Sequence, residues 1–154
     1  MRKKVLALVL MGLLTVGMVL PVQAAKMENF PVQKLSSNSP QYTRAIQVMM
    51  LNYNSTTRAY IINSGGVDGS YGYATADAIE AFQVSKNIEV DGSCGPETWK
   101  TLRNSLIYKT LEGSYKIYKG PYPYWSNQYN MKQYNSTTGS WYCYAAYNTW
   151  KFVG

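Results

Sequence analysis

The sequence predicts a mainly α protein in which a small three-helix bundle, built from two half-repeats, is followed by a short aromatic-rich, hairpin-like β segment. The first reason is a nine-residue pattern, V-D-G-S-x-G-x-x-T, which occurs at residues 67–75 and again at 90–98. Each copy runs into an apolar pattern with helical spacing. The second reason is residues 115–154, which hold nine of the fifteen Tyr and three of the four Trp. Such aromatic residues favour strands.

A first helix is expected to begin at residues 39–40, where Ser can cap the helix and Pro suits its first position. Its buried face is expected to hold residues spaced at i, i+3, i+4 and i+7, namely Ile46, Met49, Met50 and Tyr53. Residues 52–57 should end this helix. Residues 58–63 should then form a short extended stretch before the Gly pair at 65–66.

The repeated pattern is expected to form the joints between helices. Asp68-Gly69 and Asp91-Gly92 are turn signals, because Gly readily takes a positive φ and Asp can accept N–H bonds within its own turn. Gly72 should open a second helix, and Gly95-Pro96 a third. The inward residues are Thr75, Ala78, Ile79 and Phe82 in the second helix and Trp99, Leu102 and Leu106 in the third. The pattern therefore predicts fold joints and contains no obvious reaction chemistry.

The N-terminus has the features of a secretory signal peptide over residues 1–24. Three basic residues precede an apolar stretch at residues 5–20, and small residues precede a cut after Ala24. An uncleaved anchor is the alternative, but a spanning helix needs about 20 apolar residues. We expect a linker at residues 25–38, a helical domain at 39–110 and a basic Tyr/Trp-rich segment at 111–154.

Charge is concentrated near the C-terminus. Without the three basic residues of the signal, the chain holds 12 basic and 8 acidic residues, a net charge of +4. Residues 113–154 hold four Lys and no acidic residue. This basic segment favours an anionic partner such as a wall polymer or a lipid surface, although general solubility explains it equally well. Export and the low Arg content argue against nucleic acid.

The two cysteines, Cys94 and Cys143, could pair in an exported chain. Such a bridge would close a loop of about 50 residues and add roughly 4 kcal/mol of stability. The alternative is two free cysteines that act as small apolar residues.

Taken together, these residues resemble the peptidoglycan-binding domain-like family. The resemblance rests on A-I-Q and L-N at residues 45–47 and 51–52, V-D-G-x-Y-G-x-x-T at 67–75, A-I-x-A-F-Q at 78–83, and V-D-G-x-x-G-P-x-T-W-x-x-L at 90–102. It covers residues 39–108, roughly half of the expected mature chain. Tyr73, Asn87 and Cys94 depart from the residues usual in the family. The resemblance implies a three-helix fold and non-catalytic binding to peptidoglycan, with a separate wall hydrolase as an accompanying partner.

The candidates for contact with glycan or stem peptide are polar and aromatic residues near the first turn: Arg58, Tyr60, Asn63, Asp68, Tyr71 and Tyr73. Aromatic rings can stack on the flat apolar faces of sugars, and the guanidinium of Arg58 can meet a stem-peptide carboxylate. Each candidate can instead be an ordinary surface or core residue. For Asp68 and Asp91, turn chemistry favours a structural role.

Catalysis is not expected. The chain has no His, which excludes His-assisted nucleophiles and the usual zinc sites of wall amidases. The acids lie mostly in turns and on helix faces, so a glycosidase pair is not evident. The Asp-x-Ser-x-Gly spacing lacks the remaining ligands of a calcium loop. We expect a secreted peptidoglycan-binding protein without metal or cofactor. A secreted bacteriocin-like antimicrobial effector and a structural wall or spore-surface protein are the alternatives.

Overall fold

The computed structural model describes residues 26–122, 131–136, 139–145 and 149–154. Within these residues the chain forms four α-helices and a five-stranded sheet, preceded by a short 3-10 helix, η1 (Met27–Asn29). The helices are α1 (Pro40–Leu51), α2 (Ser55–Asn63), α3 (Tyr73–Lys86) and α4 (Pro96–Ser105). The strands are β1 (Ile107–Glu112), β2 (Tyr115–Lys119), β3 (Met131–Tyr134), β4 (Trp141–Ala145) and β5 (Thr149–Phe152).

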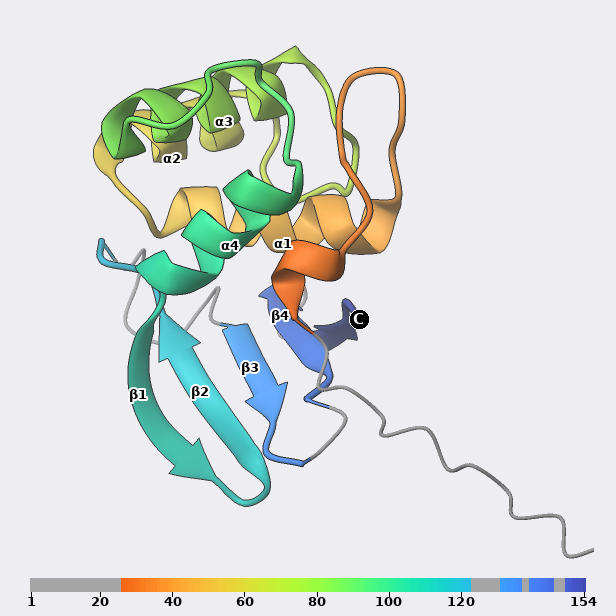
Figure 1. Cartoon of the computed structure of the whole chain (residues 1–154), viewed down its shortest axis with the longest axis vertical. Coiled ribbons are helices and arrows are strands. Elements are labelled where there is room, and N and C mark those ends of the chain that lie inside the picture. The colour runs from red at the N-terminus through yellow and green to blue at the C-terminus, as the bar shows by residue number, and fades with distance from the viewer. Residues whose placement is uncertain (1–25, 123–130, 137–138, 146–148) are drawn as a thin grey trace, which may run out of the picture.

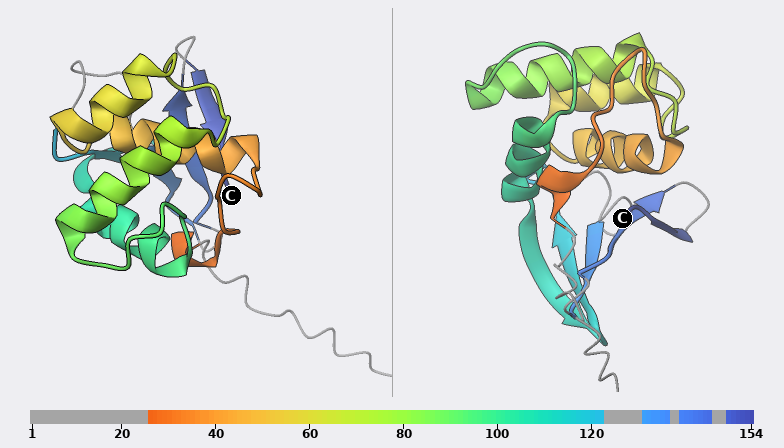
Figure 2. Two further views of the ribbon diagram at one scale, coloured as in Figure 1. Left: turned by 90° about the horizontal axis from the view of Figure 1, so that it is seen from above. Right: turned by 45° about the vertical axis from the view of Figure 1, so that its right-hand side comes forward.

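The helices lie on one side of the sheet, and α1 lies between the strands and the pair α2 and α3, while α4 runs down to β1 (Figure 1). The strands pair antiparallel in the order β1-β2-β3-β4-β5, so each strand lies beside its neighbour in sequence. Viewed from the side, the sheet extends below the helical layer (Figure 2). Because α1 contacts α2 and α3 on one side and β3 and β4 on the other, every residue from Ala45 to Leu51 is buried.

One hydrophobic core serves the helices and the inner face of the sheet. Phe82 and Trp99, from the helical layer, belong to the same buried cluster as Trp141 and Cys143 of β4. Val153 joins this cluster next to the C-terminus, and its backbone N–H donates to the carbonyl of Trp141 at 2.8 Å. Without the sheet, the helical layer would therefore expose part of its hydrophobic core to water.

The three-helix prediction is wrong by one helix, because residues 58–63 are helical and not extended. Helix α2 begins with a capping box in which the Asn54 side chain accepts from the backbone N–H of Thr57, and the Thr57 hydroxyl accepts from that of Asn54. Its inward residues are Thr57 and Ile61. The β-branched residues and the weak amphipathic pattern of this segment favour a strand locally, but the cap and the packing on α3 stabilise a helix.

The β region is larger than the expected hairpin. Strands β4 and β5 pair as a hairpin within the expected β segment, and three further strands extend the sheet back to Ile107. Strands β1 and β2 turn at Gly113, which has a φ of +56°. The sheet thus starts within the segment that the sequence grouped with the helices.

Residues 26–38, expected to be a linker, form a strap packed on the helical layer. Met27 is fully buried, and the carbonyl of Pro31 accepts from the indole N–H of Trp99 at 3.3 Å. Gln33 and Cys94 exchange two backbone hydrogen bonds, at 3.2 and 2.9 Å. The strap therefore contributes a short β-bridge beside the second turn.

The expected pairing of Cys94 with Cys143 is wrong, because the structure holds both as free, buried cysteines. Cys94 lies beside the strap through its bridge to Gln33, whereas Cys143 lies on β4 opposite Met131. Each thiol fills space in the core without a bridge.

In the part of the chain that the structure describes, no helix is long and apolar enough to cross a membrane. The signal peptide expected at residues 1–24 lies outside the described residues.

Candidate functional site

The first turn of the repeat is held by a buried glutamine on the preceding helix. The side-chain amide nitrogen of Gln47 donates to Asp68 Oδ1 at 2.8 Å, to the carbonyl of Ser70 at 3.1 Å and to Thr75 Oγ1 at 3.3 Å. Its amide oxygen accepts from the backbone N–H of Gly69 at 2.9 Å. Asp68 Oδ1 also accepts from the N–H of Ser70 at 2.8 Å. We call this arrangement the first clamp.

The second turn has the same arrangement around Gln83 of α3. Its amide nitrogen donates to Asp91 Oδ1 at 2.9 Å, to the carbonyl of Ser93 at 3.0 Å and to Thr98 Oγ1 at 3.1 Å. Its amide oxygen accepts from the N–H groups of Asp91 and Gly92, at 3.1 and 3.0 Å. Asp91 Oδ1 accepts from the N–H of Ser93 at 2.8 Å. This second clamp confirms that both Asp side chains bond within their own turns.

The glycines of both turns are required by backbone conformation, and an added side chain would also displace the mobile ends of neighbouring side chains. Gly69 and Gly92 have φ angles of +83° and +64°, which side chains rarely adopt. A Cβ on Gly92 would lie 2.9 Å from Glu80 Oε1, and one on Gly69 would lie 3.0 Å from Arg44 Cζ. The repeated pattern therefore specifies turn geometry, and Oδ1 of each Asp is engaged within its own turn.

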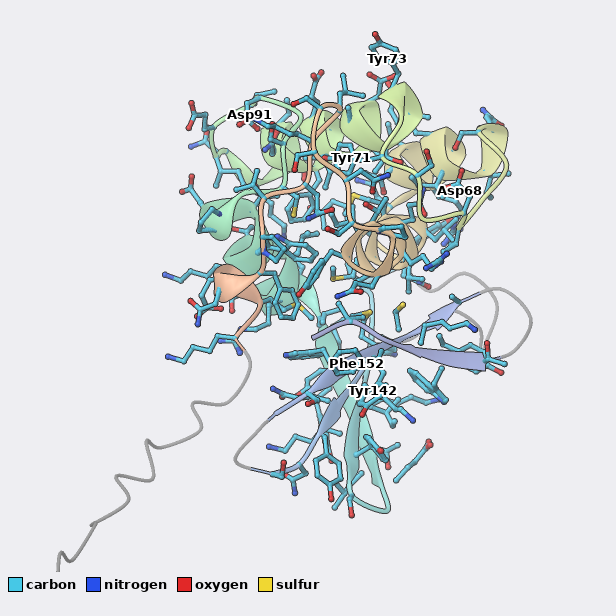
Figure 3. All side chains as sticks on the ribbon, turned by 90° about the vertical axis from the view of Figure 1, so that its right-hand side faces the viewer. Asp68, Tyr71, Tyr73, Asp91, Tyr142 and Phe152 are labelled. Atoms are coloured by element: carbon cyan, nitrogen blue, oxygen red, sulfur yellow. The ribbon has the colours of Figure 1, made fainter. Side chains whose placement is uncertain are left out.

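Tyr71, a candidate ligand contact, instead links the two turns. Its side chain is 4% exposed, and its hydroxyl donates to the carbonyl of Gly92 at 2.8 Å. Burial, followed by the negative charges around the second turn, raises the pKa of this hydroxyl well above its usual value. Figure 3 shows Tyr71 within the helical layer, whereas Tyr73 projects away from it. The ring of Tyr71 is therefore a core element.

Arg58 is also engaged within the protein. Its Nε donates to the carbonyl of Leu51 at 2.9 Å, and its Nη2 donates to the carbonyl of Tyr122 at 2.6 Å. The guanidinium carbon lies 4.3 Å from the centre of the Tyr122 ring. Arg58 thus ties α2 to the chain that follows β2.

Tyr60 and Asn63 are the two candidates that the structure brings together. They line a surface hollow on the outer side of α2, whose other residues are Ser55, Thr56 and Ala59. Tyr60 is 38% exposed, so part of its ring is open to a ligand. Serine, threonine and asparagine side chains around a ring supply donors and acceptors for sugar hydroxyls and amides. We call this feature the α2 hollow.

Tyr73 and Asp68 do not line the α2 hollow. Tyr73 is the first residue of α3 and is 78% exposed, and Asp68 lies in the first turn (Figure 3). The six candidates therefore occupy several places: one buried, two engaged in internal hydrogen bonds, one projecting alone, and two in the hollow.

Sequence reasoning missed a second hollow region, beside the second turn. Its walls come from the strap and from the turn, with Lys34, Asp91 and Ser93 shared by two adjoining hollows. Glu89 and Glu97 line one of these, and Glu80 lines the other. This region could not be predicted because one of its walls is the strap. Residues 34–38 have a polar, aperiodic sequence that is typical of a loop and gives no sign of packing on the second turn.

Two turn–helix units, each locked by a buried glutamine, define a small helical repeat module. Residues 45–102 match the family model described as "Putative peptidoglycan binding domain", which confirms the resemblance over both clamps. No curated protein and no solved structure gave a match. Where Asn87 departs from the family's usual residue, it ends α3 with a φ of +53°, a conformation that Asn tolerates better than most residues.

Proposed function

We propose that this protein is an exported, non-catalytic peptidoglycan-binding protein that associates with the bacterial cell wall. The observation that carries this proposal is the family match over residues 45–102, the segment that contains both clamps. Export is supported by the signal-like sequence of residues 1–24. The helical module supplies a rigid surface, because its joints are fixed by buried hydrogen bonds.

The α2 hollow is the proposed contact with the polymer. The exposed part of the Tyr60 ring can lie against the apolar face of a pyranose. The Asn63 amide, with one acceptor and two donors, can bond an N-acetyl or peptide group. Both residues come from one helix whose inward face is held by Ile61, so their spacing is fixed before a ligand arrives.

The proposal of a non-catalytic role follows from the available side chains. The chain has no His, and both cysteines are buried with pKa values raised by burial, so neither is an activated nucleophile. Release of soluble fragments from dye-labelled peptidoglycan by the pure protein would contradict this role. A separate wall hydrolase and anionic wall polymers remain proposed partners, the latter through the four Lys of residues 113–154.

Sedimentation with insoluble peptidoglycan tests the proposed function. Tyr60→Ala and Asn63→Ala should each weaken binding about fivefold, which is typical for a contact residue at a small interface. Tyr108→Ala and Asn104→Ala are matched controls, because both residues are exposed and lie outside the α2 hollow. Absence of sedimentation of the unaltered protein would overturn the proposed function. Equal binding by all four variants would move the site away from α2.

A further inference from the structure

The face of the sheet turned away from the helices carries a continuous group of aromatic residues. Directly paired residues of an antiparallel sheet share a face. Trp141 and Cys143 point into the shared core, so Tyr142 and Tyr144 point to the other side. The residues that pair with Tyr142 and Tyr144 across β2 to β5 lie on the same face. We define the outer face as Tyr115, Ile117, Lys132, Tyr134, Tyr142, Tyr144, Trp150 and Phe152.

The rings of the outer face support one another. Tyr115 and Tyr142 meet edge to face, with centroids 5.7 Å apart and planes at 87°. Tyr142 also lies 5.6 Å from Phe152, its neighbour on β5 (Figure 3). Tyr134 lies 5.2 Å from Tyr115. Such contacts favour fixed ring positions, so the surface is ordered before it meets a partner.

Lys132 lies in the middle of these rings. Its Nζ is 4.1 Å from the centroid of Tyr115, 4.4 Å from that of Trp150 and 5.2 Å from that of Tyr142. Loss of water around the amine lowers its pKa, and the charge of Glu112 opposes that shift in part. The outer face thus combines ring surfaces with one cation held by them.

The outer face is separate from the main core. Ile117 is 3% exposed but does not belong to the cluster shared by the helices and the inner face. Phe152 and Tyr134 remain 54% and 37% exposed. Burial of Ile117 accounts for part of the aromatic packing, but fold stability does not require so many rings to stay at the surface.

We propose that the outer face binds the glycan strand of peptidoglycan, as a second subsite in addition to the α2 hollow. This inference rests on the proposed function. A pyranose ring has an apolar C–H face bordered by hydroxyls, and the tyrosines offer flat rings bordered by hydroxyls. Lys132 supplies donors for ring hydroxyls and acetyl carbonyls. The chemistry of the face is therefore complementary to an N-acetylated sugar chain. Glu112, the partner of Tyr115 on β1, places one carboxylate at the edge of this face, near Lys132.

The probe is the hexamer of β-1,4-linked N-acetylglucosamine, which carries no peptide. In the unaltered protein, titration should shift the NMR signals of Tyr142, Tyr144 and the Trp150 indole N–H. Tyr142→Leu and Lys132→Met should each weaken hexamer binding about fivefold, as for a central contact residue. Tyr108→Leu and Lys100→Met are the matched controls, since both residues are exposed and lie outside the outer face.

The outcomes separate this inference from the proposed function. Shifts confined to α2, or no shift at all with the hexamer while peptidoglycan still sediments the protein, would overturn the outer-face subsite and leave the proposed function standing. Thermal unfolding of each variant is measured alongside. If Tyr142→Leu loses fold as well as binding, the shift map of the unaltered protein still decides, because it involves no substitution.

Discussion

The two turns of the helical module and the outer face of the sheet are built from similar polar and aromatic residues but use them in opposite ways. In the turns, the Oδ1 atoms of Asp68 and Asp91 accept hydrogen bonds from the glutamine side chains of the clamps and from nearby backbone N–H groups. On the outer face, the rings contact one another at their edges and leave surface exposed. Repetition in the sequence thus marks the joints of the fold, while the less regular region offers more unused surface for a partner.

The two regions also differ in whether they belong to the shared hydrophobic core. The family match ends at residue 102, yet the core of the matched segment is completed by Trp141, Cys143 and Val153. In energetic terms the helical module and the inner face of the sheet are one unit. Only the outer face is separate from that unit, which makes it the region where substitutions should affect binding more than folding.

The largest expected effect comes from removing the sheet. A chain ending at Glu112 would lose Trp141 and expose one side of α1, whose residues from Ala45 to Leu51 are all buried. Loss of a buried Trp alone costs about 3–5 kcal/mol, which approaches the whole stability of many small domains. The truncated chain should show no cooperative thermal unfolding by circular dichroism. A sharp transition would contradict the shared core and show that the helices fold alone.

The next effect tests the clamps. Gln47→Leu and Gln83→Leu keep the side-chain volume but leave the turn groups without partners, so each should lower the free energy of unfolding by about 3 kcal/mol. Gln83→Leu should lower the free energy of unfolding more than Gln47→Leu. The reason is that the side-chain oxygen of Gln83 accepts from two backbone N–H groups, whereas that of Gln47 accepts from one. Urea unfolding measures both, and Lys100→Leu, at an exposed position on α4, is the control. A loss no greater than the control would show that the clamps are incidental.

The helices α1, α3 and α4, the positive-φ glycines and the in-turn Asp bonds were predictable because local rules decide them. Helix α2 was not, since its segment favours a strand locally and is helical because of Asn54 and the packing of Ile61. The strap was missed for a related reason: its backbone pairs with Cys94, far away in sequence. In the site, Tyr60 and Asn63 were predicted together, but burial of Tyr71 and engagement of Arg58 depend on tertiary contacts.

A smaller effect comes from titratable protons that are buried at the turns and on the inner face of the sheet. Burial raises the pKa of the Cys143 thiol from 9.0 to about 12, although the charge of Arg44 opposes the shift in part. Above pH 9 the unfolded chain releases this proton while the folded protein keeps it, so the folded state binds more protons and stability falls as pH rises. Tyr71 and Cys94 act in the same direction.

The measurement is urea unfolding at pH 8 and pH 10.5. The Cys143 thiol alone should account for a loss of about 2 kcal/mol across that interval, from about 1.4 kcal/mol per pH unit above its unfolded pKa. Cys143→Ala should show a correspondingly shallower fall. If the variant and the unaltered protein lose the same stability, Cys143 is not the group that senses pH, and the comparison shifts to Tyr71 and Cys94.

The smallest expected effect is that of a reducing agent, which should leave the melting temperature unchanged. A bridge between Cys94 and Cys143 would join the second turn to the sheet and add roughly 4 kcal/mol, a difference of many degrees in a domain of this size. With both cysteines free, protein purified without reductant should release two thiols per chain in denaturant and react slowly when folded, because both are buried. Fewer than one reactive thiol per chain in denaturant would show that Cys94 and Cys143 are paired. The second turn and β4 would then be linked covalently. The truncated chain would lose that disulfide as well as the shared core, so both losses would contribute to its unfolding.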